Sequence, residues 1–235
     1  MHRLQTKTKT FTVSHPFVGP AVYIGSMLYF VAQIVTGWVW NPAYSVVTNN
    51  ISDLGNTVCG TYGQRFVCSP RHVVMNVAFI LLGIIMVVGS LLLYQEFTNL
   101  TGRFRRGART GFAMMAVAGV GAIIVGSFPE NTVKIMHFVG ATLAIGVGDA
   151  AIFVLGCYLP LPRRWRDAMR WYSALALLAL LLFGTQHDFG VGGGLMERFA
   201  QYPQTIWLIL FGFYVSRDHY IHRRSGEKVA AENLA

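Results

Sequence analysis

The residues of this chain that can do chemistry gather in three polar segments set between long apolar runs. The first segment contains Ser52 and Asp53 within Asn50-Ile51-Ser52-Asp53-Leu54-Gly55, the second contains Glu130, and the third contains Glu197-Arg198. A carboxylate can act as a general base, and an arginine can hold a phosphate or carboxylate with two parallel hydrogen bonds. The acids together with Arg198 therefore predict a site for a polar, anionic group.

Ser52 and Asp53 have two interpretations. Asn, Ser and Asp bond to nearby backbone N–H groups, and Gly55 tolerates a positive φ, so the segment is typical of a turn or a helix start. In the functional interpretation, Asp53 is a general base, a metal ligand or a contact to a polar headgroup, and Ser52 is a ligand contact.

His137 lies about one turn inside an apolar run, where an ionisable group is costly. At 100° per residue, Ala144 and Gly148 share its direction, so it heads a stripe of small residues that should face another helix. It is either a catalytic residue or a hydrogen-bonded contact between helices. Glu130, between Pro129 and Asn131, is either a second catalytic candidate or an acid that favours helix initiation.

The third segment follows a glycine run and contains several candidate ligand-binding residues. Glu197 and Arg198 form either an ion pair at the interface or a clamp in which Arg198 holds a headgroup. The other candidates in this segment are His187, Asp188 and Tyr202.

Zinc is the cofactor that these side chains suggest. His72, His137 and His187 all fall near one boundary of the apolar runs, and three imidazoles can bind zinc and leave a position for water. They come from three separate segments, however, and the chain contains no HExxH motif.

Cys59 and Cys68 enclose a short segment in the first polar loop. In an oxidising compartment this spacing predicts a disulfide.

Composition decides the class of protein. Of 235 residues, 54% are hydrophobic and 12% charged, with a mean hydropathy of +0.47. These values exclude disordered and collagenous chains, and the formal charge of +9 is explained by membrane topology rather than by a nucleic-acid partner. We predict an all-α bundle of six transmembrane helices, over residues 17–39, 72–94, 110–127, 136–158, 170–185 and 203–219.

The basic residues give the orientation. Fifteen of the 19 lysines and arginines fall in the two tails and in the second and fourth connections, so we expect both termini to be cytoplasmic. The predicted organisation is a basic tail over residues 1–16, a membrane domain over 17–219 and a second cytoplasmic tail over 220–235, in a multi-pass protein of the plasma (inner) membrane. All three candidate segments then lie on the extracytoplasmic side.

Asp149 lies deep inside a predicted span, in the inner half of residues 136–158, whereas Asp218 lies at the cytoplasmic end of the sixth span. Asp149 is either a structural polar contact or a proton site, because transporters place acids at such depths.

The motifs resemble a known family. Asn50 to Gly55, Phe128-Pro129-Glu130, His137-Phe138-Val139-Gly140-Ala141, and Glu197-Arg198 with Tyr202-Pro203 and Trp207 occur in the order found in the six-span prokaryotic membrane family catalogued as domain of unknown function 998. The likeness covers roughly Pro16 to Ser216 and implies the fold and membrane location but no reaction. The Ile51-Ser52-Asp53 turn also looks like the eukaryotic DRAM/FRAG1 group.

Two functions follow as hypotheses. In the first, a polar pocket that opens to the extracytoplasmic side binds or processes lipid headgroups. In the second, the chain is a non-enzymatic transporter, sensor or accessory subunit of a membrane complex, and glycine-rich spans allow close contact with a second copy or another partner. Membrane lipids are partners in either case.

Overall fold

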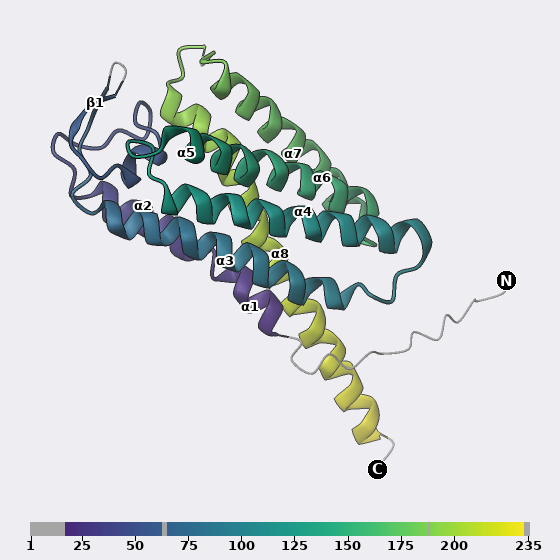
Figure 1. The fold of residues 1–235 in the computed structure, drawn as a ribbon. Helices are drawn as coiled ribbons and strands as arrows, with labels where there is room; N and C mark the ends of the chain where they lie inside the picture. Colours follow the sequence, from purple (N-terminus) through teal and green to yellow (C-terminus); the bar gives the residue numbers. More distant parts are fainter. Residues whose placement is uncertain (1–16, 63–64, 188, 233–235) are drawn as a thin grey trace.

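The computed structural model describes residues 17–62, 65–187 and 189–232, and this part of the chain is almost entirely helical (Figure 1). Two of the expected spans are interrupted: the first by a break at Gly25-Ser26, and the fourth by a π-helical stretch. The elements are α1 (Val18–Ile24), α2 (Met27–Gly37), η1 (Ser52–Gly55), β1 (Gly60–Tyr62), β2 (Arg65–Val67), α3 (His72–Glu96), α4 (Gly102–Ser127), α5 (Lys134–Ala141), η2 (Thr142–Val147), α6 (Gly148–Tyr158), α7 (Arg163–Gly184) and α8 (Gly193–Glu232).

Five helical segments are long and apolar enough to cross a membrane: Val18–Gly37, His72–Glu96, Gly102–Ser127, Lys134–Tyr158 and Arg163–Gly184. They correspond to the first five predicted spans. The third and fifth begin seven or more residues earlier than the apolar runs, because helical structure continues into the arginine-rich segments that precede them. The chain is therefore a multi-pass integral membrane protein.

The last helix, α8, has too many polar residues to meet the same criterion, and their direction explains why. Glu197, Gln201, Gln204 and Thr205 follow the helical spacing i, i+4, i+7 and i+8, and all four are buried inside the bundle. The outward face is apolar: Leu210 is 49% exposed and Phe213 is 51% exposed. This distribution is the reverse of that on a helix that faces water.

Glycines bring the central helices into backbone contact. A Cβ placed on Gly83 of α3 would lie 2.4 Å from the carbonyl oxygen of Gly119 in α4, and one on Gly121 would lie 2.5 Å from the backbone nitrogen of Ala144 in η2. Small residues allow this close approach, which gains van der Waals contact between helices. The core therefore centres on α3, α4 and the helix that α5, η2 and α6 form together.

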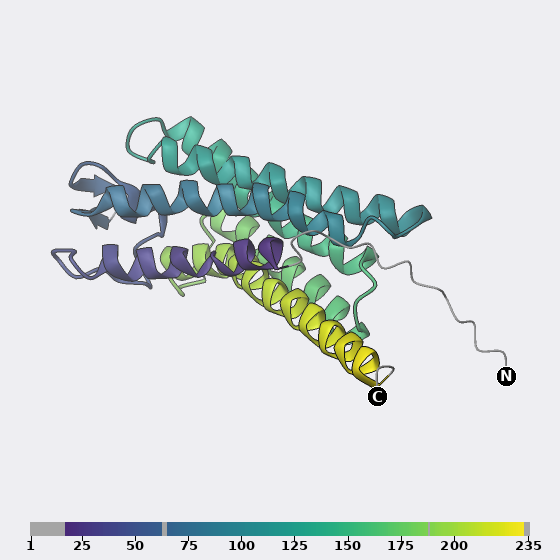
Figure 2. The same cartoon turned by 90° about the horizontal axis from the view of Figure 1, so that it is seen from below.

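The connections separate into two groups at opposite ends of the bundle (Figure 1). The loop between α2 and α3, the turn before α5 and the connection from α7 to α8 lie at one end, which we call the outer end. The arginine-rich starts of α4 and α7 lie at the other. In Figure 2, α8 runs obliquely past the other helices, and its C-terminal part projects beyond them.

The loop at the outer end has its own structure. After η1, strands β1 and β2 form an antiparallel hairpin in which Gly60 pairs with Val67. Cys59 and Cys68, which flank this hairpin, are joined by a disulfide, so the predicted pairing is confirmed.

Candidate functional site

Polar side chains of the first loop fold inward over the outer end of the bundle. Ser52 and Asp53 of η1 are both buried, as are Asn49, Asn50 and Asn56 on either side. Buried polar groups are usually hydrogen-bonded, and Asn56 departs from this rule, because neither of its amide atoms has a partner among the described residues.

Asp53 is fully buried and paired with Arg65 from the disulfide-closed hairpin. Arg65 donates from Nε to Oδ2 at 2.7 Å and from Nη2 to Oδ1 at 2.9 Å, and the backbone N–H of Asn50 donates to Oδ2 at 2.8 Å. The paired bonds between guanidinium and carboxylate hold the hairpin against η1. All of these contacts of Asp53 are internal to the protein.

Glu197 of α8 lies under the same turn. Its Oε2 accepts a hydrogen bond from the backbone N–H of Ile51, and its Oε1 accepts one from the backbone N–H of Ser52 at 3.4 Å. Burial, with a smaller contribution from the carboxylate of Asp53, raises the pKa of Glu197 from its ordinary value of 4.5 to about 7, against the opposing effects of the Ile51 N–H and Arg198. The outer end therefore contains a carboxyl group that can change its protonation near neutral pH.

Arg198 fastens the preceding stretch of the loop to α8. Its Nη1 donates to the carbonyl oxygens of Val46 and Asn49, each at 3.0 Å, and of Gly194 at 2.7 Å, while Nη2 donates to the Tyr44 hydroxyl. The guanidinium also lies 5.5 Å from the ring centroid of Tyr44. These contacts engage both terminal nitrogens of Arg198 within the protein.

Beneath this cap lies a small cavity, of about 30 Å³, which we call the polar chamber. By volume it holds about two water-sized groups. Helices α2, α3, α4, α5 and α8 together with η1 and η2 enclose it, and its lining combines polar and apolar side chains. Its lining is Tyr29, Ser52, Phe79, Leu82, Ala122, Val125, His137, Ala141, Ala144, Ile145, Glu197 and Gln201.

One ring nitrogen of His137, a residue of the chamber lining, is bonded to the backbone. Its Nδ1 is 2.9 Å from the carbonyl oxygen of Phe128, and a carbonyl oxygen only accepts, so Nδ1 donates. In the neutral imidazole the remaining nitrogen, Nε2, is then basic. With a hydroxyl from Ser52 and a carboxyl from Glu197 in the same lining, the chamber contains the groups needed to bind a small polar group and to move a proton.

The remaining described candidates, Glu130, Tyr202 and His187, do not line this chamber. Glu130 sits in the turn before α5, with Oε2 buried and without a hydrogen bond to the described residues. Tyr202 donates from its hydroxyl to Gln33 Oε1 at 2.8 Å. His187 is exposed, with Nδ1 2.9 Å from Thr185 O. Asp188 falls outside the described residues.

The three predicted zinc ligands do not come together. His72 starts α3, with Nδ1 3.1 Å from Ser69 O, His137 is in the chamber and His187 is at the surface between α7 and α8. Among the described side chains, those of residues 17–62, 65–187 and 189–221, no three of His, Cys, Asp or Glu gather closely enough to hold a metal ion.

Three residues of the site were missed by sequence reasoning: Arg65, Gln201 and Tyr29. Gln201 had a signal, since it lies four residues after Glu197 and thus on the same helical face. Arg65 had a weaker one, its position between the two cysteines. Tyr29 had none, because it sits in an apolar run and becomes part of the site only through packing.

Asp149 is a separate feature, in the first turn of α6. It is completely buried, and neither carboxyl oxygen has a hydrogen-bond partner among the described residues. It does not line the polar chamber.

These features define a class: a polytopic helical membrane protein with a buried polar site at one end of its bundle. The chain matches the profile of the family described as protein of unknown function (DUF998) over residues 23–214, and it belongs to that family. The predicted resemblance to this family is thereby confirmed, whereas the likeness to the DRAM/FRAG1 group stays a prediction. Comparisons with curated proteins and with solved structures found no match.

Proposed function

We propose that this protein binds the polar portion of a membrane lipid in the polar chamber at the outer end of its bundle. The observation that carries the proposal is the placing of Ser52, His137, Glu197 and Gln201 around one cavity enclosed by membrane-spanning helices. Ligand sites combine a mostly apolar lining with a few convergent polar groups, and this cavity has that composition. Its volume of about 30 Å³ admits a part of the headgroup about the size of two water molecules.

The proposal includes six spans, of which the sixth is residues 203–219 of α8. It also places the protein in the plasma membrane with both termini in the cytosol. The reversed polarity of α8 supports its role as a span, because lipid tails favour the outward-facing Leu210 and Phe213. The arginine-rich starts of α4 and α7 at one end support the orientation. A single cysteine placed beside Glu130, in a background without native cysteines, should react with a membrane-impermeant thiol reagent from outside intact cells. Labelling that requires broken cells contradicts the orientation.

The lipid-binding experiment compares the lipids that purify with the protein. Ser52→Ala removes a hydroxyl from the chamber lining, and His137→Asn replaces the imidazole by a shorter amide that has no basic nitrogen. Ser127→Ala is the matched control, because its exposed hydroxyl bonds to Ile123 O at the same end of the bundle. Mass spectrometry of lipids extracted from equal amounts of protein should show that one lipid class falls in the two chamber variants and not in the control. Unchanged lipid content in both chamber variants contradicts the proposal.

The same chamber supports a chemical step if the bound lipid contains a hydrolysable bond. Nε2 of His137 would act as general base toward a water or toward Ser52, because the Phe128 carbonyl would hold the proton of the neutral ring on Nδ1 and leave Nε2 as the acceptor. Purified protein incubated with the lipid class identified above should then release product, and His137→Asn should abolish the release.

A second candidate function, proton-coupled transport, is favoured by Asp149. An unpaired carboxyl buried within a span is costly, and such groups are common in proton pathways. In vesicles that contain a pH-sensitive dye and the purified protein, a pH gradient should collapse faster than in empty vesicles, and Asp149→Asn should restore the slow rate. Equal rates for the wild type and Asp149→Asn remove this candidate.

A further inference from the structure

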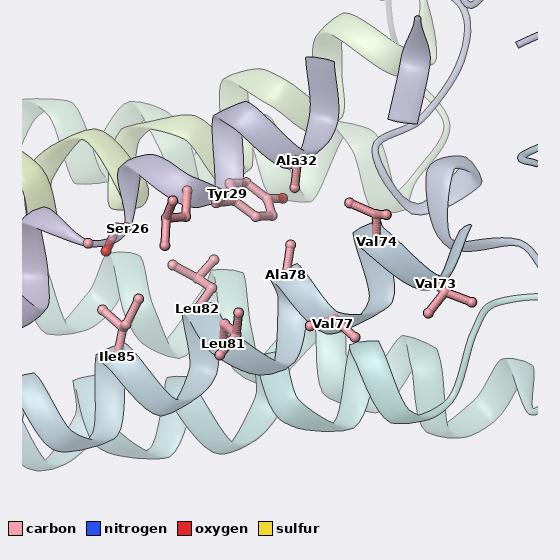
Figure 3. A pocket seen from close by; sticks show the side chains of 12 residues that line it. Ser26, Tyr29, Ala32, Val73, Val74, Val77, Ala78, Leu81, Leu82 and Ile85 are labelled. Carbon is pink, nitrogen blue, oxygen red and sulfur yellow. The ribbon is translucent and has the colours of Figure 1, made fainter. Parts of the chain in front are cut away.

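A lateral groove lies between the first span and α3, with a volume of about 390 Å³ (Figure 3). Val74, Ala78 and Leu82 of α3 line one side, and Ser26, Tyr29 and Ala32 line the other. The volume falls within the range of about 300–1,000 Å³ typical of small-molecule sites.

The local sequence explains why the two helices leave a gap here. The first span breaks between α1 and α2 at Gly25-Ser26, and small residues, Ala32 and Ala78, face each other farther along (Figure 3). The rim is open to the side of the bundle: Leu28 is 58% exposed, Val73 61% and Val77 47%. Around a membrane-spanning bundle, the material that meets this rim is hydrocarbon.

The groove adjoins the polar chamber. Tyr29 and Leu82 line both, so these two side chains form the wall between them. The Tyr29 hydroxyl is buried and has no hydrogen-bond partner among the described residues. In Figure 3 it lies at the Ala32 end of the ring, which is the outer end of α2. A buried hydroxyl without a hydrogen-bond partner costs free energy, and an acceptor supplied by a ligand would recover it.

We infer that the lateral groove holds one acyl chain of a membrane glycerolipid, with its ester oxygen accepting a hydrogen bond from Tyr29 and its polar end directed to the polar chamber. This inference rests on the proposed function, because it assigns the same lipid to both spaces. An acyl chain matches the apolar lining through dispersion contacts along its length. The ester supplies the acceptor that Tyr29 lacks. In a glycerolipid the ester lies between the apolar acyl chain and the polar headgroup.

A photoreactive lipid tests this directly. The full-length protein is placed in vesicles of phosphatidylethanolamine and phosphatidylglycerol doped with phosphatidylethanolamine that carries a diazirine at the middle of one acyl chain. After illumination, peptide mapping should find adducts concentrated on the groove residues of α3, Val77 and Leu81. Adducts spread evenly over the exposed apolar faces, such as that of Leu175 on α7, overturn the inference.

Two variants of α3 make the result specific. Val77→Trp fills the groove from its rim, and Val88→Trp is the matched control: it lies eleven residues later on the same helix, is 40% exposed and does not line the groove. Val77→Trp should reduce groove adducts at least fivefold, and Val88→Trp should leave them unchanged. Equal adducts in both variants overturn the inference. So do disulfide crosslinks between two copies of the protein that carry Val77→Cys, because they would show that a second polypeptide occupies the groove.

The polar end is tested with Tyr29→Phe, which retains the ring and removes the hydroxyl. Loss of one hydrogen bond should weaken lipid retention about fivefold, and unchanged retention overturns the role of Tyr29. The two proposals fail differently. If Val77→Trp removes the adducts while Ser52→Ala and His137→Asn retain their lipid, the groove binds a chain but the chamber does not bind its head. If only the chamber variants lose lipid, the groove is not the site of its chain.

Discussion

Replacing Glu197 by Gln tests the electrostatics of the outer end most directly, because it removes a proton-binding group with little change in shape. Glu197 is buried, and its pKa is raised from 4.5 to about 7. The folded protein therefore binds more protons than the unfolded chain between these pH values, and the free energy of unfolding falls as pH rises through this window. At about 1.4 kcal/mol per pKa unit, Glu197 lowers the free energy of unfolding by about 3 kcal/mol above pH 7 relative to pH 4.

The assay is chemical unfolding of the detergent-solubilised protein at several pH values from 4 to 8 for the wild type and Glu197→Gln. The difference between the two curves isolates Glu197 from the other titrating groups, and it should change by about 3 kcal/mol across the range. Ser127→Ala, which removes an exposed hydroxyl at the same end of the bundle and no titrating group, is the control and should run parallel to the wild type. Parallel curves for Glu197→Gln would refute the argument, since they would mean that burial does not perturb this carboxyl.

Three further changes test the structure around the site. Arg198→Lys should lower the free energy of unfolding by about 3 kcal/mol, because a lysine cannot donate to the three carbonyls and the Tyr44 hydroxyl together; an unchanged unfolding midpoint contradicts this. Serine at both Cys59 and Cys68 should cost about 2.5 kcal/mol, given their separation of nine residues, and should abolish sensitivity of the melting temperature to reductant. Gly83→Ala should destabilise by about 2 kcal/mol, because its Cβ would lie 2.4 Å from Gly119 O, whereas Gly60→Ala, with no atom within 4 Å, should stay near wild type; equal melting temperatures for the two alanine variants count against close packing of α3 and α4.

Much of the fold was predictable because a membrane restricts the available structures so strongly. A long apolar segment in lipid must satisfy its own backbone, so the first five spans follow from hydropathy alone. The sixth was harder, since Glu197, Gln201, Gln204 and Thr205 lower the mean hydropathy of α8 although they face the protein interior. A window average gives equal weight to the two faces of a helix, whereas only the outer face meets lipid.

The sequence predicted the end of the bundle at which the candidate site lies, but not which of its residues contact one another. Charge asymmetry assigned Asp53, Glu130, His137, Glu197 and Arg198 to one end of the bundle, and Figure 1 shows their elements gathered there. Which residues meet depends on long-range packing: the backbone N–H groups of Ile51 and Ser52 reach Glu197 across some 145 residues. No local pattern encodes a contact at that separation.

The sequence by itself therefore determined the membrane class, the helical fold, the family, the disulfide and the end of the bundle at which polar residues gather, because these depend on composition and short spacings. Only the tertiary structure decided that Asp53 and Arg198 are engaged by Arg65 and by loop carbonyls, that His72 and His187 lie apart from His137, and that Tyr29 separates the polar chamber from an apolar groove. The physical reason is that a side chain's partners are set by how helices pack, and packing depends on residues far apart in the chain.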